Sequence, residues 1–222
     1  AAVFQSLGSD PVGPIRSGRF QDINLLGSLN KPLFVWSGGN SKVTSAIKKS
    51  NLVNMGALIA YKQGGYRRES GRKAPHNLYA DAEKIYTLTP KGASRPPQQF
   101  AYRGESDAMP TSATPSDGLR LSMDGVQVSW MWDAASSSYM RWSGKDKHLD
   151  ADKTQVAAKN IVVMYMVYKA SEADVRSPEA QSVGEGDVWI YSNGSLVKGK
   201  WARALATDVF TLTDSAGAPV KQ

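Results

Sequence analysis

The sequence predicts an α/β (α+β) fold, with a mixed sheet and helices in the first half and a largely antiparallel sheet in the second half. In the first half, apolar residues spaced by three or four alternate with short continuous apolar runs. After residue 116 the apolar residues instead follow the two-residue period of strands. A further sign of antiparallel pairing is Asn193-Gly194, which stands between two apolar runs and is a strong hairpin signal.

Three segments near the start have clear local patterns. Apolar residues at a spacing of three favour one helix face in residues 20–29. A continuous apolar run favours a buried strand at residues 33–36. Residues 43–49 follow a Gly-Gly turn and favour a short helix, with Asn40 or Ser41 as its cap.

The boundary between the halves is expected in a long connection. Residues 77–85 favour a further helix, and residues 91–116 are then rich in Pro, Ser, Gly and Gln. Such a composition offers little apolar surface to pack, so we expect a long surface connection. We therefore expect an N-terminal mixed α/β domain of residues 1–115 and a C-terminal, mostly β domain of residues 116–222, packed together as one unit.

The second half contains a series of candidate strands. The clearest, residues 125–132, alternates with Val and Trp on one face. Other apolar runs suited to strands are found at residues 139–142, 160–168, 187–191, 196–201 and 209–212. Five of the six tryptophans fall on these strands, where large aromatic side chains normally fill a sheet face. A sugar-stacking platform is the alternative role for them.

Composition excludes several classes of protein. Hydrophobic content of 41% and charged content of 21% are ordinary for a globular protein, and no apolar stretch reaches the length of a membrane span. The absence of cysteine excludes disulfides, thiolate metal sites and cysteine nucleophiles. The formal net charge is +7, but the cations are dispersed, which favours a general surface charge over a specific nucleic-acid groove.

Three loops indicate a basic, glycine-lined pocket for an anion. They are the run GPIRSGR at residues 13–19, the Ser-Gly-Gly-Asn turn at 37–40 and the cationic loop at 67–77. Arginine binds carboxylate or phosphate through two parallel hydrogen bonds, glycine allows close backbone approach, and a helix opening at residue 20 would add a favourable dipole. The expected ligand-binding residues are Arg16, Ser17, Arg19, Gly38, Gly39, Arg68, His76 and Asn77. The alternative is that Arg16 and Arg19 pair with internal carboxylates such as Asp22.

The two histidines have different surroundings. His76 follows Pro75 and is a candidate general acid or base, or else a loop histidine bonded to backbone. His148 alternates with three aspartates, Asp146, Asp150 and Asp152, but the glycine turn and distal glutamate of a calcium loop are missing. We expect a solvated hairpin rim there, and neither a metal nor a cofactor. Fingerprints of nucleotide-binding loops, nucleophile elbows and zinc proteases are missing as well.

These motifs, in this order, resemble the YerB-like bacterial lipoproteins of the DUF3048 type, which have an N-terminal and a C-terminal subdomain. The first half carries GPIRSGR, Ser37-Gly38-Gly39, Arg68 and the APHNLY run at 74–79. The matching pieces of the second half are residues 128–130, 139–141, 148–150 and 160–163, with Gly194 and residues 199–201. Family members usually begin with a signal peptide and a lipid-bearing cysteine and end in one more strand. We therefore expect this chain to be the core of a longer form.

The resemblance implies an extracytoplasmic, membrane-tethered protein of the bacterial cell envelope, with its membrane association through an N-terminal lipid anchor. It implies no particular reaction. From the residues we expect a protein that binds an anionic small molecule or cell-wall component, with no specific nucleic-acid partner. Two alternatives are a hydrolase or transferase acting on a cell-wall or phosphate-bearing substrate with His76 as acid–base, and an envelope interaction protein using its Trp-rich sheet.

Overall fold

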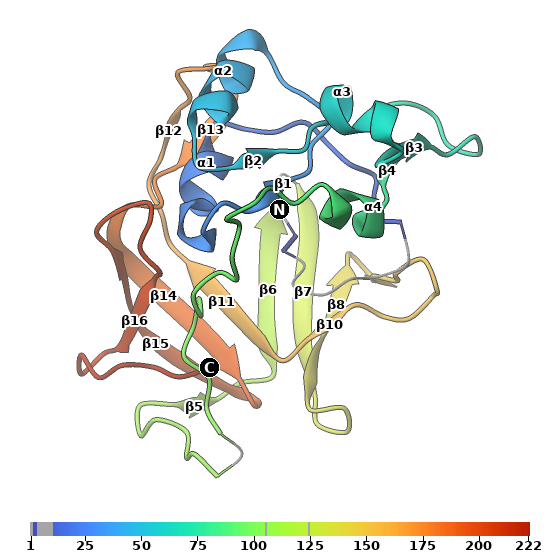
Figure 1. The fold of residues 1–222 in the computed structure, drawn as a ribbon. Helices are drawn as coiled ribbons and strands as arrows, with labels where there is room; N and C mark the ends of the chain where they lie inside the picture. The colour runs from blue at the N-terminus through green and yellow to red at the C-terminus, as the bar shows by residue number, and fades with distance from the viewer. Residues whose placement is uncertain (1, 4–10, 105, 124) are drawn as a thin grey trace. The chain divides into compact units, whose positions relative to one another are not determined.

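The computed structural model describes residues 2–3, 11–104, 106–123 and 125–222, drawn as a ribbon in Figure 1. The chain forms two compact units, which do not follow a simple division at residue 115. Unit 1 comprises residues 1–99, 167–183 and 204–209, and unit 2 comprises residues 100–166, 184–203 and 210–222. Two segments from the second half of the chain thus belong to the unit built by the first half.

Unit 1 combines short helices with paired strands. Its α-helices and 3-10 helices are α1 (Gln21–Leu25), η1 (Gly27–Leu29), α2 (Ser41–Lys49), α3 (Ala57–Ala60), η2 (Tyr61–Gln63) and α4 (Ala82–Thr87). Its strands are β1 (Leu33–Phe34), β2 (Val53–Asn54), β3 (Tyr66–Arg68), β4 (Leu78–Ala80), β12 (Tyr168–Ala170) and β13 (Pro178–Ala180). The pair β1–β2 is parallel, whereas β3–β4 and β12–β13 are antiparallel. This mixture of helices with parallel and antiparallel pairs confirms the α+β class.

The helices expected near the start are present. α1 and η1 lie within residues 20–29, and α2 occupies the region expected for the second helix. The cap of α2 is Asn40, whose side-chain oxygen accepts a hydrogen bond from the Val43 N–H at 2.9 Å. This bond satisfies one of the N–H groups that a helix start leaves without a backbone partner.

The helix predicted over residues 77–85 is wrong in its first half. Residues 78–80 form β4, paired with β3, and α4 begins at Ala82 after Asp81, whose carboxylate accepts from the Lys84 N–H at 3.0 Å. Leu78 and Ala80 are both buried, so the two-residue alternation of a half-buried strand decides the structure here. Pairing with β3, the preceding strand, therefore overrides the local helical pattern.

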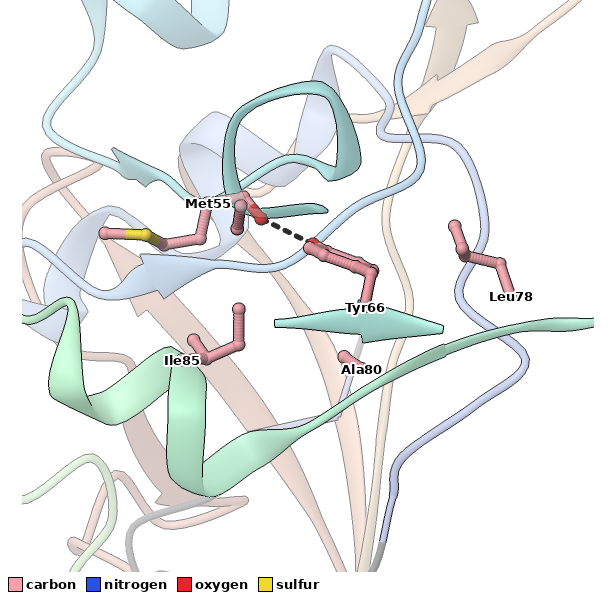
Figure 2. Close-up of a cluster of buried hydrophobic side chains, with 6 residues drawn as sticks. Met55, Tyr66, Leu78, Ala80 and Ile85 are labelled. Atoms are coloured by element: carbon pink, nitrogen blue, oxygen red, sulfur yellow. Dashed lines mark hydrogen bonds between the residues drawn. The ribbon is translucent and has the colours of Figure 1, made fainter. Parts of the chain in front are cut away.

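Tyr66 of β3 lies at the centre of one core of unit 1. Its hydroxyl donates to the backbone oxygen of Met55 and accepts from the Trp36 N–H at 3.2 Å. Burial raises the pKa of this phenol. Figure 2 shows the bond to Met55 and the neighbouring buried side chains Leu78, Ala80 and Ile85. The hydroxyl thus ties β3 to the segments around β1 and β2.

A second core of unit 1 lies beneath α2. Val43 and Ile47 of α2 pack in one cluster with Phe34, Trp36 and Leu52. The ring centres of Phe34 and Trp36 are 5.7 Å apart, and the Trp36 indole N–H donates to the side-chain oxygen of Asn54 at 2.8 Å. The strand expected at residues 33–36 is shorter in the structure, where β1 covers Leu33–Phe34, and the side chain of Trp36 beyond it is fixed at both its apolar and its polar groups.

Unit 2 is formed by antiparallel strands, and its described residues contain no helix. The strands are β5 (Thr114–Pro115), β6 (Gly118–Met123), β7 (Val126–Asp133), β8 (Ser138–Ser143), β9 (Asp146–Lys147), β10 (Ala157–Ala158), β11 (Asn160–Met164), β14 (Gly184–Ser192), β15 (Ser195–Arg203) and β16 (Thr211–Asp214). One sheet has the order β10-β8-β7-β6, with β9 beside β8. The other has the order β11-β14-β15-β16, with β5 beside β15. The prediction of an antiparallel second half is confirmed.

The tryptophans of unit 2 help to build its cores. Trp132 packs on Tyr139 with the ring centres 4.9 Å apart, in a cluster that contains side chains from both sheets. Trp201 is buried on the other face of the second sheet, beside Phe210. The Pro- and Ser-rich segment covers part of that same cluster with Phe100, Met109 and Ala113. This segment, although poor in apolar residues, thus still contributes packing contacts to the core.

The strand boundaries of unit 2 differ from expectation at several places, such as β14, which begins at Gly184 rather than at residue 187. β11 ends at Met164, whereas the predicted strand ran to Tyr168, which lies in β12 of unit 1. β16 begins at Thr211 rather than at residue 209. The predicted hairpin is confirmed, since β14 and β15 are joined through Asn193 and Gly194, with φ of 47° and 68°. Positive φ at both positions is what a two-residue hairpin turn of type I′ requires.

Candidate functional site

The run at residues 13–19 lies between two parts of unit 1. The Ile15 N–H donates to the oxygen of Leu78 at 2.7 Å, which attaches the run to β4. Further along, the Ser37 N–H donates to the oxygen of Arg16 at 2.9 Å, and the Gly18 N–H donates to the oxygen of Gly38 at 3.1 Å. These backbone bonds bring two of the three predicted loops together.

Gly18 allows this close approach. A Cβ atom at this position would lie 2.7 Å from the Trp36 ring and 3.2 Å from the Phe34 ring. Distances this short require the neighbouring rings to move, and both rings are buried. The glycine therefore faces the core, while the residues on either side of it point elsewhere.

Arg16 reaches the third predicted loop. Its Nη1 lies 2.9 Å from Nδ1 of His76, and both residues are exposed. An arginine is always a donor, so Nδ1 must be the acceptor and the ring proton must be on Nε2. His76 is therefore bound to Arg16 in its neutral form.

Arg68 meets the next residue of the same loop. Its Nη1 donates to the side-chain oxygen of Asn77 at 2.7 Å. The backbone of Asn77 is also held in place. Its backbone oxygen accepts a hydrogen bond at 2.8 Å from the N–H of Glu69, the residue that follows β3. Arg16 and Arg68 thus converge on His76 and Asn77, and these four residues are called the arginine cluster below.

Neither arginine of the cluster is neutralised by a carboxylate among the described residues. The ion pairs found there involve other cations, such as Arg67 with Glu69. Arg16 and the loop at 67–77 together carry five cationic side chains against one carboxylate. A surface with these charges attracts anions.

Arg19 has different hydrogen-bond partners from Arg16. Its guanidinium donates to the oxygen of Gly18 at 3.3 Å, and its backbone N–H donates to the carboxylate of Asp22 at 2.7 Å. The alternative in which Asp22 pairs with an arginine side chain is therefore not found. Asp22 also places a negative charge at the start of α1, where we expected the helix dipole to assist a ligand.

Arg19 lines a groove that contains only some of the predicted ligand-binding residues. The groove has a volume of about 570 Å³ and is called the Gly38 groove below. Of the predicted residues, Ser17, Arg19, Gly38 and Gly39 line it. The four residues of the arginine cluster do not. The residues expected to form a single pocket thus lie in two separate places, both within unit 1.

One wall of the Gly38 groove comes from a segment that the sequence analysis did not single out. It is formed by residues 171–179, which connect β12 to β13 and include the first two residues of β13. Side chains of the first half hold this wall in place: Asn40 donates to the oxygen of Ala173 at 3.0 Å, and Lys42 donates to the oxygen of Glu172 at 3.1 Å. No local pattern in the sequence indicates such a return of the chain, so residue spacing could not have revealed it.

The candidate cation site around His148 is not assembled. Asp150 and Asp152 accept hydrogen bonds from the turn residues Ala151 and Thr154. Within the described ranges, no group of three or more His, Asp or Glu side chains is arranged to hold a metal ion. Across the same residues, no helix is long and apolar enough to cross a membrane.

Comparison with protein families identifies the chain. The N-terminal domain model of the DUF3048 family, described as a protein of unknown function, matches residues 1–95, and the C-terminal domain model matches residues 119–222. The chain therefore belongs to the DUF3048 family, of which it carries both domains in order.

Among solved structures, the fold is similar to the crystal structure of the YerB protein from Bacillus subtilis. The TM-score is 0.74 at 16% sequence identity, and the match covers 95% of this chain and 70% of that chain. At this identity the likeness concerns the fold. No curated protein matches the chain.

Proposed function

We propose that this protein binds an anionic ligand bearing a carboxylate or a phosphate, and that the arginine cluster holds the anion. The observation that carries the proposal is that Arg16 and Arg68, both exposed, donate to neutral acceptors, His76 and Asn77. Such bonds orient each guanidinium and leave its charge uncompensated. The remaining N–H groups can still form the two parallel bonds that carboxylates and phosphates accept.

The proposal includes a place of action, the bacterial cell envelope, with a cell-wall component as ligand. Wall polymers carry phosphates and carboxylates, which are the groups that the arginine cluster suits. The envelope location is proposed from the family resemblance, and localisation of the protein by cell fractionation tests it.

The competing hypothesis is a hydrolase or transferase in which His76 transfers a proton. A catalytic histidine usually has a carboxylate or hydroxyl within hydrogen-bond reach, which orients it. The ring of His76 instead contacts Arg16, and no such partner for it occurs among the described residues. We therefore favour binding over catalysis. His76→Ala separates the two, because it should weaken a complex modestly but remove most turnover from an enzyme.

Calorimetric titration with glycerol phosphate and with a carboxylate-bearing muropeptide, at low and high salt, tests the proposal. Wild type should bind at least one of them, more weakly at high salt. Arg16→Ala and Arg68→Ala should each cost about 1–3 kcal/mol, and Arg16→Lys should also lose affinity because an ammonium lacks the planar fork. Arg67→Ala is the matched control, since Arg67 lies beside Arg68 on β3 but is paired with Glu69. If neither ligand binds, or if the three arginine variants bind as wild type does, the proposal is wrong.

A further inference from the structure

We infer that the Gly38 groove is a second binding site, whose ligand is a small zwitterion: an amino acid or a short peptide with free ends. This inference goes beyond the anion site, because none of the arginine cluster lines the groove. It rests on two side chains of opposite charge, Arg19 and Glu179, which both line the same cavity.

Neither charge is neutralised by a described residue. The guanidinium of Arg19 donates to the neutral oxygen of Gly18. The carboxylate of Glu179 accepts no hydrogen bond and joins no ion pair within the described ranges, and it lies more than 4.0 Å from Arg19. The two groups are therefore both available, one for a carboxylate and the other for an ammonium group.

The second carboxylate of the groove is already engaged. Asp174 accepts from the backbone N–H of Arg176 at 3.1 Å, from the side chain of Arg176 at 3.3 Å and from the Ser177 hydroxyl at 3.4 Å. These hydrogen bonds lower the pKa of Asp174 below its ordinary value. Asp174 thus stabilises the turn that forms the wall, and Glu179 is the carboxylate available to a ligand.

The charge of the lining argues against a purely anionic ligand here. Arg19 is the one cation of the lining, and Asp174 is paired with Arg176 outside the lining, so the charges left for a ligand are those of Arg19 and Glu179. A phosphate or simple carboxylate would be attracted by Arg19 and repelled by Glu179. A zwitterion satisfies both signs, because each of its ends can meet the opposite charge.

The rest of the lining suits a peptide. Ser17 and Ser37 line the groove with the Gly38–Gly39 backbone, and their hydroxyls can both donate to and accept from amide groups. Leu58 is 90% exposed at the groove and offers an apolar contact for a side chain. A volume of about 570 Å³ lies within the usual range of small-ligand sites.

The test is an NMR titration with the dipeptide Ala-Leu and with two blocked forms, N-acetyl-Ala-Leu and Ala-Leu amide. Wild type should bind Ala-Leu saturably and each blocked form about tenfold to a hundredfold more weakly, which is the scale of losing one hydrogen-bonded charge. Arg19→Gln should bind Ala-Leu and its amide equally well. Glu179→Gln should bind Ala-Leu and its acetylated form equally well.

Matched controls are Glu172→Gln, in the same segment but outside the lining, and Arg67→Gln. Both should keep the wild-type preference for the zwitterion. The inference is wrong if Ala-Leu does not saturate the protein, if the blocked forms bind equally well to wild type, or if a control loses the preference. Its failure is separable from failure of the anion site, because the latter is judged by phosphate and muropeptide binding to the Arg16 and Arg68 variants.

Discussion

Nη1 of Arg16 lies 2.9 Å from Nδ1 of His76, although sixty residues separate them in the chain. This bond joins two of the three loops that the sequence analysis assigned to one anion pocket. It also defines the chemical state of the histidine, because the guanidinium can only donate.

His76 should therefore be the neutral tautomer that carries its proton on Nε2. Two-dimensional NMR of the imidazole nitrogens at neutral pH should show an unprotonated Nδ1 in wild type. Arg16→Ala should remove this restriction and change the Nδ1 signal, whereas Arg67→Ala should not. A proton on Nδ1 in wild type would contradict the arrangement of the arginine cluster.

Gly18→Ala should destabilise the protein by about 1–3 kcal/mol, the usual cost of overfilling a packed core. The added methyl group would lie 2.7 Å from the Trp36 ring. Gly71→Ala is the control, because no heavy atom lies within 4 Å of its Cβ position and its φ is not in the left-handed region. Denaturant unfolding should show no loss for Gly71→Ala, and equal effects of the two substitutions would count against the close contact.

Tyr66 should make stability depend on alkaline pH. Burial raises the pKa of Tyr66 above the unfolded value of about 10. The contribution of the neutral phenol to the free energy of unfolding is therefore complete below pH 10 and is lost as the pH rises further. Tyr66→Phe should cost about 1–3 kcal/mol at neutral pH by leaving the Met55 oxygen without its donor. The variant should also lose less stability between pH 9 and pH 11 than wild type.

Urea unfolding across this pH range measures both effects of Tyr66→Phe. Tyr61→Phe is the control, because Tyr61 is 49% exposed. Part of the alkaline loss should remain in the Tyr66 variant, since burial also raises the pKa values of Tyr139 and Tyr191. An unchanged pH profile in Tyr66→Phe would show that this phenol ionises as freely in the folded protein as in the unfolded chain.

Gly194→Ala should destabilise the β14–β15 hairpin through two effects. An alanine is strained at a φ of +68°, by about 1–2 kcal/mol, and its Cβ would lie 2.8 Å from the Trp132 indole nitrogen. Gly144→Ala separates the effects, because Gly144 has a φ of +61° and open space around its Cβ position. Thermal unfolding should show a larger loss for Gly194→Ala, and a smaller one would contradict the turn geometry.

Sequence patterns predicted those parts of the fold that local interactions decide. The cap and periodicity of α2 and the Asn-Gly turn are examples, since their signals lie within a few residues. The helix expected across residues 77–85 failed because β4 is determined by its pairing with β3 and by burial of Leu78 and Ala80. Tertiary pairing of this kind leaves little trace in local spacing.

The candidate site shows the same limit. The spacing of Arg16 and Arg19 suggested one anion pocket, yet Arg16 contacts His76 and Arg19 lines the Gly38 groove. Gly18, which lies between the two arginines in the chain, packs against the rings of Trp36 and Phe34, a contact that residue spacing does not reveal. The return of residues 171–179 to unit 1 depends on contacts more than a hundred residues apart in sequence, such as Asn40 with Ala173.

The most direct measurement follows the arginine side chains themselves while glycerol phosphate is added. In ¹⁵N-labelled protein, the Nε–H signals of Arg16 and Arg68, assigned from the alanine variants, should shift together and saturate at one ligand concentration. The signal of Arg67, paired with Glu69, should stay near its starting position. High salt should weaken the effect. If the Arg16 and Arg68 signals do not move, or if all arginine signals shift alike without saturation, the arginine cluster is not an anion-binding site.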